Sequence, residues 1–166
     1  IPECQTAGLI PKNSQNFFTL DSVFLKKIKE EFYKSEKKIS RLLLHNSPSD
    51  NVQEMIICYG KDTLIYPNCS VGKSESLNVL EGKMKLINFD TSGKVTANLE
   101  MEPKGSSSNP FMYRFNKCEW HTMIAMSELV LVHEILEGPF TVETAPSPDW
   151  VPNTPDSLSK FYKKII

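Results

Sequence analysis

Two residues of this chain, Glu75 and His121, have side chains that could exchange protons with a ligand. A carboxylate and an imidazole are common acids and bases of proteins near neutral pH. Because an unpaired carboxylate is costly in an apolar interior, we expect the two side chains to satisfy each other if both point inward. The pair is then either a functional acid and base or a structural contact in which His121 is a hydrogen-bonded core residue.

Length, charge and cysteine content limit the class of protein. The 166 residues are 40% hydrophobic, enough for one core and a single domain. Nucleic-acid binding requires a clustered basic surface, and a chain with a net charge of -1 offers no sign of one. No nucleic-acid partner is therefore expected. No apolar run reaches the roughly 20 residues of a membrane span, and no signal-peptide pattern opens the chain. The chain has four cysteines and no Cys-x-x-Cys pair, which favours a reducing compartment. These observations together predict a soluble, cytoplasmic protein.

The N-terminal part predicts an arm and one helix. Residues 1–18 have little periodicity and are expected to pack against the domain or hang free. Asp21 is a suitable N-cap for an amphipathic helix that ends near Ser35. Its apolar positions recur at helical spacing: Phe24, Leu25, Ile28 and Phe32.

After a turn at residues 46–50, nearly every segment favours strands. Residues 64–90 are expected to form the wall and polar floor of a small barrel, and the turn at residues 90–93 closes a hairpin because glycine supplies positive φ. Short strands at this spacing predict an all-β jelly roll. The expected strand segments are residues 52–59, 77–79, 84–89, 95–101, 111–115, 120–126 and 129–136.

The proline-rich tail excludes long strands but permits a short helix. Thr154 and Pro155 form a good helix start, a cap followed by a first-turn proline. We expect a terminal helical turn or two carrying Leu158, Phe161 and Tyr162 onto the body. The predicted organisation is an arm and helix at 1–38, a barrel at 39–140 and a packed tail at 141–166.

Several separated motifs resemble a known family. Residues 75–82 have the Glu-x6-Gly spacing of the first cupin motif, and residues 116–121 have the spacing of the second, which ends at His121. Together with residues 41–45, 52–53 and 137–140, they resemble the WbuC-type cupin-fold metalloproteins of the RmlC-like superfamily, which occur in bacterial surface-polysaccharide gene clusters. The resemblance implies a cupin barrel, a double-stranded β-helix, between the N-terminal helix and the C-terminal helical segment.

The resemblance also implies a metal site with two ligands replaced. The positions that match its ligand set are Asn68, Ser70, Glu75 and His121, so two histidines of the family pattern are an amide and a hydroxyl here. Because these are poor donors for zinc, iron, nickel or manganese, we expect a degenerate site that binds a divalent metal weakly or not at all. Strand alternation predicts that Asn68 and Ser70 point inward and Cys69 outward.

Other residues are candidate ligands or lumen groups. Cys118 and His121 have Cys-x-x-His spacing, and a thiolate beside Glu75 would suit zinc, although a packed turn thiol is the simpler interpretation. Tyr66 and Tyr113 are candidate ligand-binding residues. Alternatively, they are residues of the apolar core or of the barrel rim. His133 lies in an apolar strand and is expected to be structural or to face outward.

Three functions follow from these residues. The first is a metal-poor cupin that binds a small polar ligand, such as a sugar or sugar nucleotide, through Asn68, Ser70, Tyr66 and Tyr113. The second is an isomerase or epimerase that uses His121 and Glu75 as acid and base, with or without a weak metal. The third is a structural barrel that forms a homodimer through a sheet face.

Overall fold

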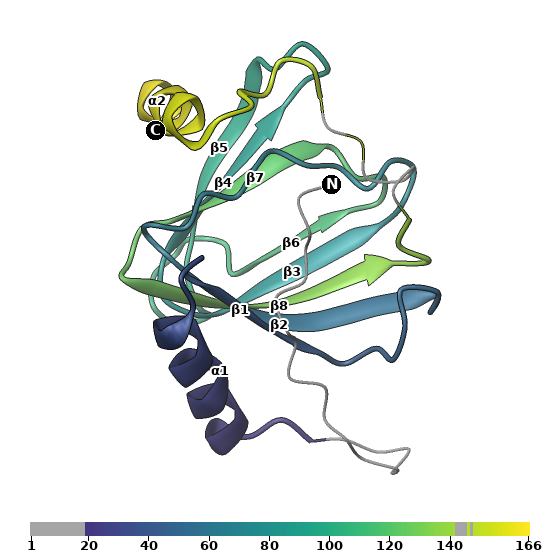
Figure 1. Cartoon of the computed structure of the whole chain (residues 1–166), viewed down its shortest axis with the longest axis vertical. Coiled ribbons are helices and arrows are strands. Elements are labelled where there is room, and N and C mark those ends of the chain that lie inside the picture. The colour runs from purple at the N-terminus through teal and green to yellow at the C-terminus, as the bar shows by residue number, and fades with distance from the viewer. Residues whose placement is uncertain (1–18, 142–145, 147) are drawn as a thin grey trace.

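Two antiparallel sheets face each other and enclose the interior of the molecule (Figure 1). The computed structural model describes residues 19–141, 146 and 148–166, so the predicted N-terminal arm lies outside the described residues. One sheet has the order β1-β2-β8-β3-β6 and the other the order β5-β4-β7. The bounds are β1 Ile39–Leu43, β2 Val52–Gly60, β3 Glu75–Glu81, β4 Met84–Phe89, β5 Val95–Met101, β6 Met112–Phe115, β7 Trp120–Ala125 and β8 Leu129–Glu137.

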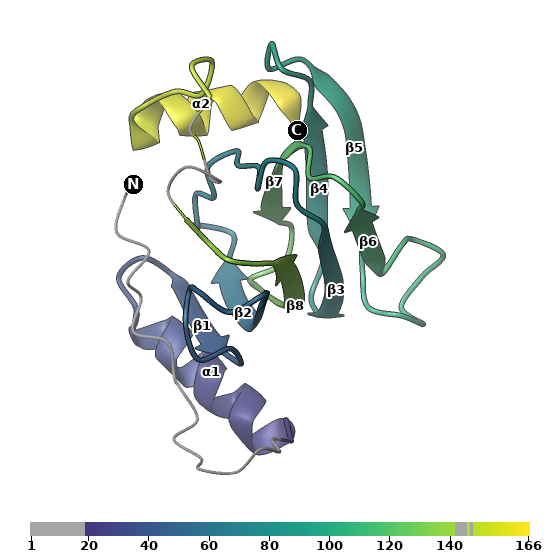
Figure 2. The same ribbon diagram turned by 90° about the vertical axis from the view of Figure 1, so that its right-hand side faces the viewer.

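This architecture confirms the predicted all-β fold of antiparallel sheets with a helix at each end. Helix α1 spans Ser22–Lys34 and helix α2 spans Pro155–Ile165. Figure 2 shows the two helices on opposite outer sides of the paired sheets. Strand β1 has no counterpart among the expected strands, whereas β4 and β5 have the predicted bounds. Neither described helix combines the length and apolar character needed to cross a bilayer.

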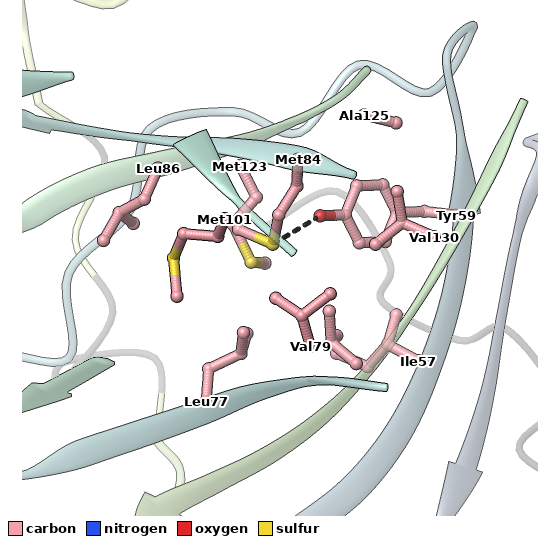
Figure 3. Packing of buried hydrophobic residues seen from close by; sticks show 11 residues of the cluster. Ile57, Tyr59, Leu77, Val79, Met84, Leu86, Met101, Met123, Ala125 and Val130 are labelled. Atoms are coloured by element: carbon pink, nitrogen blue, oxygen red, sulfur yellow. Dashed lines mark hydrogen bonds between the residues drawn. The ribbon is translucent and has the colours of Figure 1, made fainter. Parts of the chain in front are cut away.

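The main core fills the space between the two sheets. Alternate residues of β2, β3, β4, β7 and β8 point inward, as strand geometry requires, and with one residue of β5 they form one cluster of buried side chains (Figure 3). Within it, the Tyr59 hydroxyl donates to the Met84 sulfur at 3.3 Å. The cluster comprises Ile57, Tyr59, Leu77, Val79, Met84, Leu86, Met101, Met123, Ala125, Val130 and Val132.

Helix α1 covers the outer face of the five-stranded sheet. Asp21 caps it by accepting from the backbone N–H groups of Val23 and Phe24 at 2.9 and 3.1 Å, as predicted. Ile28 and Phe32 are buried in a second cluster with residues of β1, β2 and β8. Because these strands are covered on both faces, β2 and β8 contain long apolar runs instead of simple alternation.

Helix α2 packs on the outer face of the three-stranded sheet. Thr154 caps it, and Pro155 stands in its first turn, as the sequence predicted. Leu158 is fully buried, Phe161 stacks near Phe89 of β4, and Tyr162 bonds Thr122 of β7 at 3.0 Å between the two hydroxyls. The helix is longer than the predicted turn or two.

Candidate functional site

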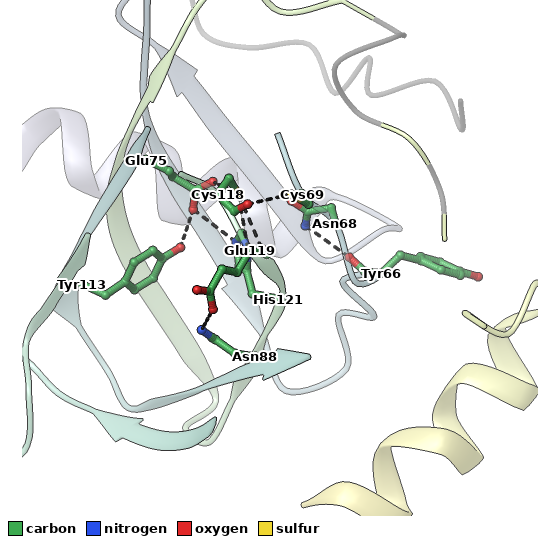
Figure 4. A network of polar contacts seen from close by, with 9 residues as sticks. All are labelled: Tyr66, Asn68, Cys69, Glu75, Asn88, Tyr113, Cys118, Glu119 and His121. Carbon is green, nitrogen blue, oxygen red and sulfur yellow. Dashed lines mark hydrogen bonds and ion pairs between the residues drawn. The ribbon is translucent and has the colours of Figure 1, made fainter. Parts of the chain in front are cut away.

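Glu75 and His121 meet inside the molecule from opposite sheets. Glu75 begins β3 in the larger sheet, and His121 is the second residue of β7 in the smaller one. Their exposed side-chain fractions are 3% and 1%, and Glu75 Oε1 lies 3.2 Å from His121 Nε2 (Figure 4). The expected contact is therefore formed, although its functional role stays a prediction.

Each member of the pair has further polar partners. The Tyr113 hydroxyl donates to Glu75 Oε1 at 2.6 Å. On the other side, His121 Nδ1 lies 2.8 Å from the carbonyl oxygen of Glu119, a geometry that suits an Nδ1–H donor. The rings of Tyr113 and Phe115 lie 6.0 and 5.0 Å from the His121 ring, centroid to centroid. These contacts fix both side chains of the pair.

The surroundings favour the charged forms of both groups. Burial opposes the charge of Glu75, but hydrogen bonds with His121, Tyr113 and Cys118 outweigh it, and the pKa of Glu75 is lowered. Burial also opposes the charge of His121, yet Cys118 and Glu75 raise the pKa of this imidazole well above its ordinary value. Burial beside the Glu75 carboxylate raises the pKa of Tyr113, which remains a hydroxyl donor. These shifts favour an ion pair between the Glu75 carboxylate and the His121 imidazolium.

Cys118 is the third residue of the site. Its sulfur lies 3.6 Å from Glu75 Oε2 and 3.8 Å from His121 Nδ1. One ligand atom from each of Glu75, Cys118 and His121 lies within 4.8 Å of the others, a spacing that could hold a metal ion. The Cys-x-x-His spacing is the sequence signal for this residue, although from the sequence alone a packed turn thiol was the simpler interpretation of that spacing.

The predicted alternation of residues 68–70 is wrong. Asn68 is exposed, and its amide bonds the Tyr66 carbonyl oxygen at 3.2 Å, whereas Cys69 is buried and donates to the Cys118 carbonyl oxygen at 3.1 Å. The physical reason is that this segment is no regular strand: it has a single isolated bridge, from Asn68 to His121. Alternation cannot be extrapolated from one bridge.

The other residues predicted to bind a ligand differ in whether they contact the pair of Glu75 and His121. Ser70 is buried, but within the described part of the chain its hydroxyl bonds neither Glu75 nor His121. Tyr66 is directed away from the pair, while Tyr113 points at Glu75 (Figure 4). Of the four residues predicted to bind a ligand, only Tyr113 contacts the Glu75 and His121 pair through its side chain.

Two polar groups near the pair were missed from the sequence. Glu134 shares the inward face of β8 with Val132, and burial followed by repulsion from Glu75 raises the pKa of Glu134 to about 7. Asn88 lies opposite His121 on β4, and its buried Oδ1 atom has no hydrogen-bond partner among the described residues. Glu134 could have been found from its alternation with Val130 and Val132, whereas the partners of Asn88 required the fold.

His133 faces outward, as expected. Its Nε2 atom lies 2.7 Å from Glu54 Oε1 on the opposite face of the sheet from the core. The exposed side-chain fractions are 25% for His133 and 36% for Glu54. This second pair of Glu and His is therefore a surface counterpart of the buried one.

Sequence and structure comparisons identify limited similarity. Residues 20–101, slightly less than half of the chain, match a family model described as a domain of unknown function (DUF6016). No curated protein matches the sequence. Protein SO0799 from Shewanella oneidensis has a similar fold, with a TM-score of 0.55 and 8% identity over 82% of this chain and 90% of that one.

More distant solved structures include cupins. A cupin superfamily protein from Desulfitobacterium hafniense has a TM-score of 0.41 and 12% identity over 60% of this chain and 76% of that one. A structure of DMSP lyases has a TM-score of 0.48 and 11% identity over 66% of this chain, and the chain spans only 52% of the lyase. These comparisons do not confirm the resemblance to WbuC-type proteins.

Proposed function

We propose that this chain is a cupin-fold protein that binds one divalent metal, best matched by zinc, through Glu75, Cys118 and His121 inside its barrel. The observation that carries the proposal is the convergence of these three different ligand atoms within 4.8 Å of one another. Thiolate, imidazole and carboxylate are all ligands of zinc, and the thiolate favours zinc over magnesium or calcium. This replaces the predicted set of Asn68, Ser70, Glu75 and His121.

The surroundings of His121 fit such a site. Histidines that bind metal through one ring nitrogen usually donate the other N–H to a carbonyl or carboxylate. Here the Glu119 carbonyl oxygen lies 2.8 Å from Nδ1, which leaves Nε2, 3.2 Å from Glu75 Oε1, for the ion. A bound ion would supply Lewis acidity to a small ligand or water in the position that three protein ligands leave open.

The remaining interior groups suit a small polar ligand. The unpaired Oδ1 of Asn88 accepts a hydrogen bond from a ligand hydroxyl or an ordered water. Glu134 offers a carboxyl group on the same interior side as Val132. Tyr113 holds Glu75 in place by its 2.6 Å hydrogen bond. A sugar or sugar nucleotide, as the resemblance to WbuC-type proteins implies, has the hydroxyl groups that these residues bind.

Metal analysis tests this proposal. Protein purified without chelator should contain about one zinc per chain, or take up one after chelation and dialysis. Cobalt(II) in place of zinc should give a thiolate charge-transfer band that disappears in Cys118→Ser. Cys58→Ser is the matched control, because Cys58 is buried in the second apolar cluster and should leave the band unchanged. A wild-type protein that binds neither ion contradicts the proposal.

A second candidate function is acid and base catalysis of the isomerase or epimerase type. It is favoured by the charge state of the pair, since a protonated His121 is an acid and an ionised Glu75 is a base. Turnover of a sugar nucleotide that persists with chelator present and disappears in His121→Asn would support this function. Turnover unchanged in His121→Asn would eliminate it.

The cellular setting is proposed from the same resemblance. We propose a cytoplasmic role in surface-polysaccharide synthesis, with residues 39–140 as the ligand-binding barrel and a homodimer formed through a sheet face. A thermal-shift screen of sugar nucleotides tests the ligand class, because a ligand that binds only the folded state raises its apparent stability. Light scattering during size-exclusion chromatography tests the dimer.

A further inference from the structure

Cys69 and Cys118 are held next to each other by the backbone. Asn68 and His121 exchange two hydrogen bonds, of 2.9 Å from Asn68 N to His121 O and 3.0 Å from His121 N to Asn68 O. A third bond, of 2.7 Å, joins Cys118 N to Lys73 O. The two cysteines therefore lie in adjacent, paired segments although they are distant in sequence. In this register Cys69 lies opposite Trp120, two residues from Cys118, so the two cysteines are diagonal neighbours across the bridge.

The Cys69 thiol also contacts Cys118 directly. Its sulfur lies 3.1 Å from the carbonyl oxygen of Cys118 and donates a hydrogen bond to it. Both are free, with exposed fractions of 5% for Cys69 and 9% for Cys118. Cys58 differs, because it is fully buried among apolar side chains of the second cluster. The chain thus places one pair of thiols together and keeps another thiol apart.

We infer that Cys69 and Cys118 form a reversible disulfide when the protein meets a peroxide. One thiol attacks the peroxide, becomes a sulfenic acid and releases water from hydrogen peroxide. The second thiol attacks that sulfur, forms the S–S bond and releases a second water. The two sulfur atoms together lose two electrons, which the O–O bond of the peroxide accepts. A dithiol reductant reverses the step by thiol–disulfide exchange.

The disulfide acts on the candidate metal site. Cys118 contributes one of the three ligand atoms, and its sulfur is 3.6 Å from Glu75 Oε2. A sulfur in a disulfide is no longer a thiolate and cannot bind the ion as one. This consequence, unlike the disulfide itself, rests on the proposed function. Peroxide should therefore release zinc, and bound zinc should slow the oxidation of Cys118.

Peptide mapping tests the disulfide without reference to metal. Trypsin places Cys69 in the peptide 62–73, Cys118 at the start of the peptide after Lys117, and Cys58 in a third peptide. Reduced, metal-free protein is treated with hydrogen peroxide, alkylated with N-ethylmaleimide and digested. We expect the Cys69 and Cys118 peptides to be joined, with the intact mass lower by two hydrogens, and dithiothreitol to restore both free thiols.

Control variants and the zinc-loaded protein separate the outcomes. Cys69→Ser should abolish the linkage, and Cys58→Ser should retain it. If the wild-type peptides remain unlinked, or if Cys69 or Cys118 joins a different cysteine, the inference is wrong, whatever the variants do. If the disulfide forms at the same rate with and without zinc and no zinc is released, the disulfide stands and the proposed metal site fails.

Discussion

Replacing Glu75 by Gln removes the negative charge of the buried pair at almost constant volume. In the native protein the carboxylate lies 3.2 Å from His121 Nε2 and accepts a 2.6 Å hydrogen bond from Tyr113. The exposed side-chain fractions of 3% and 1% mean that solvent screens this pair very little. The substitution therefore tests directly whether the pair stabilises the fold.

The expected loss follows from what each partner can do afterwards. Removing one member of a buried ion pair costs about 3–5 kcal/mol when the other charge stays behind. His121 can avoid part of that cost by losing its proton, and the new amide oxygen still accepts from Tyr113. We therefore expect the free energy of unfolding to fall by about 2–4 kcal/mol.

The loss should also depend on pH. The pKa of Glu75 is lowered from 4.5, so its contribution is complete above that pH and disappears as the pH falls through the folded value. The pKa of His121 is raised above 6.5, so its contribution is complete below that pH and disappears as the pH rises through the folded value. The difference between wild type and Glu75→Gln should thus be largest between pH 4.5 and 6.5.

Urea unfolding of chelator-treated protein measures this difference, and the surface pair supplies its control. Glu54→Gln removes a carboxylate 2.7 Å from His133 Nε2, but the two side chains are 36% and 25% exposed. We expect it to cost less than about 1 kcal/mol. Equal losses in the two variants, or a Glu75→Gln loss that is the same at pH 5.5 and pH 9, would refute the reasoning.

Three further substitutions test other parts of the molecule. Burial raises the pKa of Glu134 to about 7, so wild-type stability should fall by about 1–3 kcal/mol between pH 4.5 and pH 7, and Glu134→Gln should lack this fall in urea titrations. Asn68→Ala should change zinc affinity less than about twofold by calorimetry, whereas Cys118→Ser should lower it at least about tenfold; the reverse order would restore the original ligand set. Leu158→Ala should cost about 2–5 kcal/mol in thermal or urea unfolding because this fully buried residue anchors α2, and a loss below about 1 kcal/mol would mean that α2 is not firmly packed.

Much of the fold was predictable because local patterns agree with tertiary packing. The cap at Asp21 and the helical spacing of Ile28 and Phe32 predicted α1 because the same residues bury its apolar face. The hairpin between β4 and β5 was predictable for a similar reason. Gly93 adopts φ +85, and an added Cβ there would meet the Trp150 ring at 2.5 Å, so local turn chemistry and packing require the same residue.

The candidate site was predictable only in part. A buried carboxylate needs a partner, and this general rule is enough to pair Glu75 with His121 from the sequence. The predicted orientations of the Asn68 and Cys69 side chains were the reverse of the observed ones. Inward and outward alternation applies only within a continuous strand, and this segment has one isolated bridge. Cys118 was underrated because its distance from Glu75 depends on how a turn is folded, and spacing along the chain does not determine that distance.

The sequence by itself determined the two helices, most strands and the pair of groups that could do chemistry. These features depend on periodicity, capping and the cost of unpaired charge, all of which act between near neighbours or on single side chains. Only the tertiary structure decided that Cys118 converges on Glu75 and His121, that Cys69 lies against Cys118, and that Asn68 faces outward. That arrangement depends on the packing of two sheets and on one irregular segment, where distant parts of the chain meet.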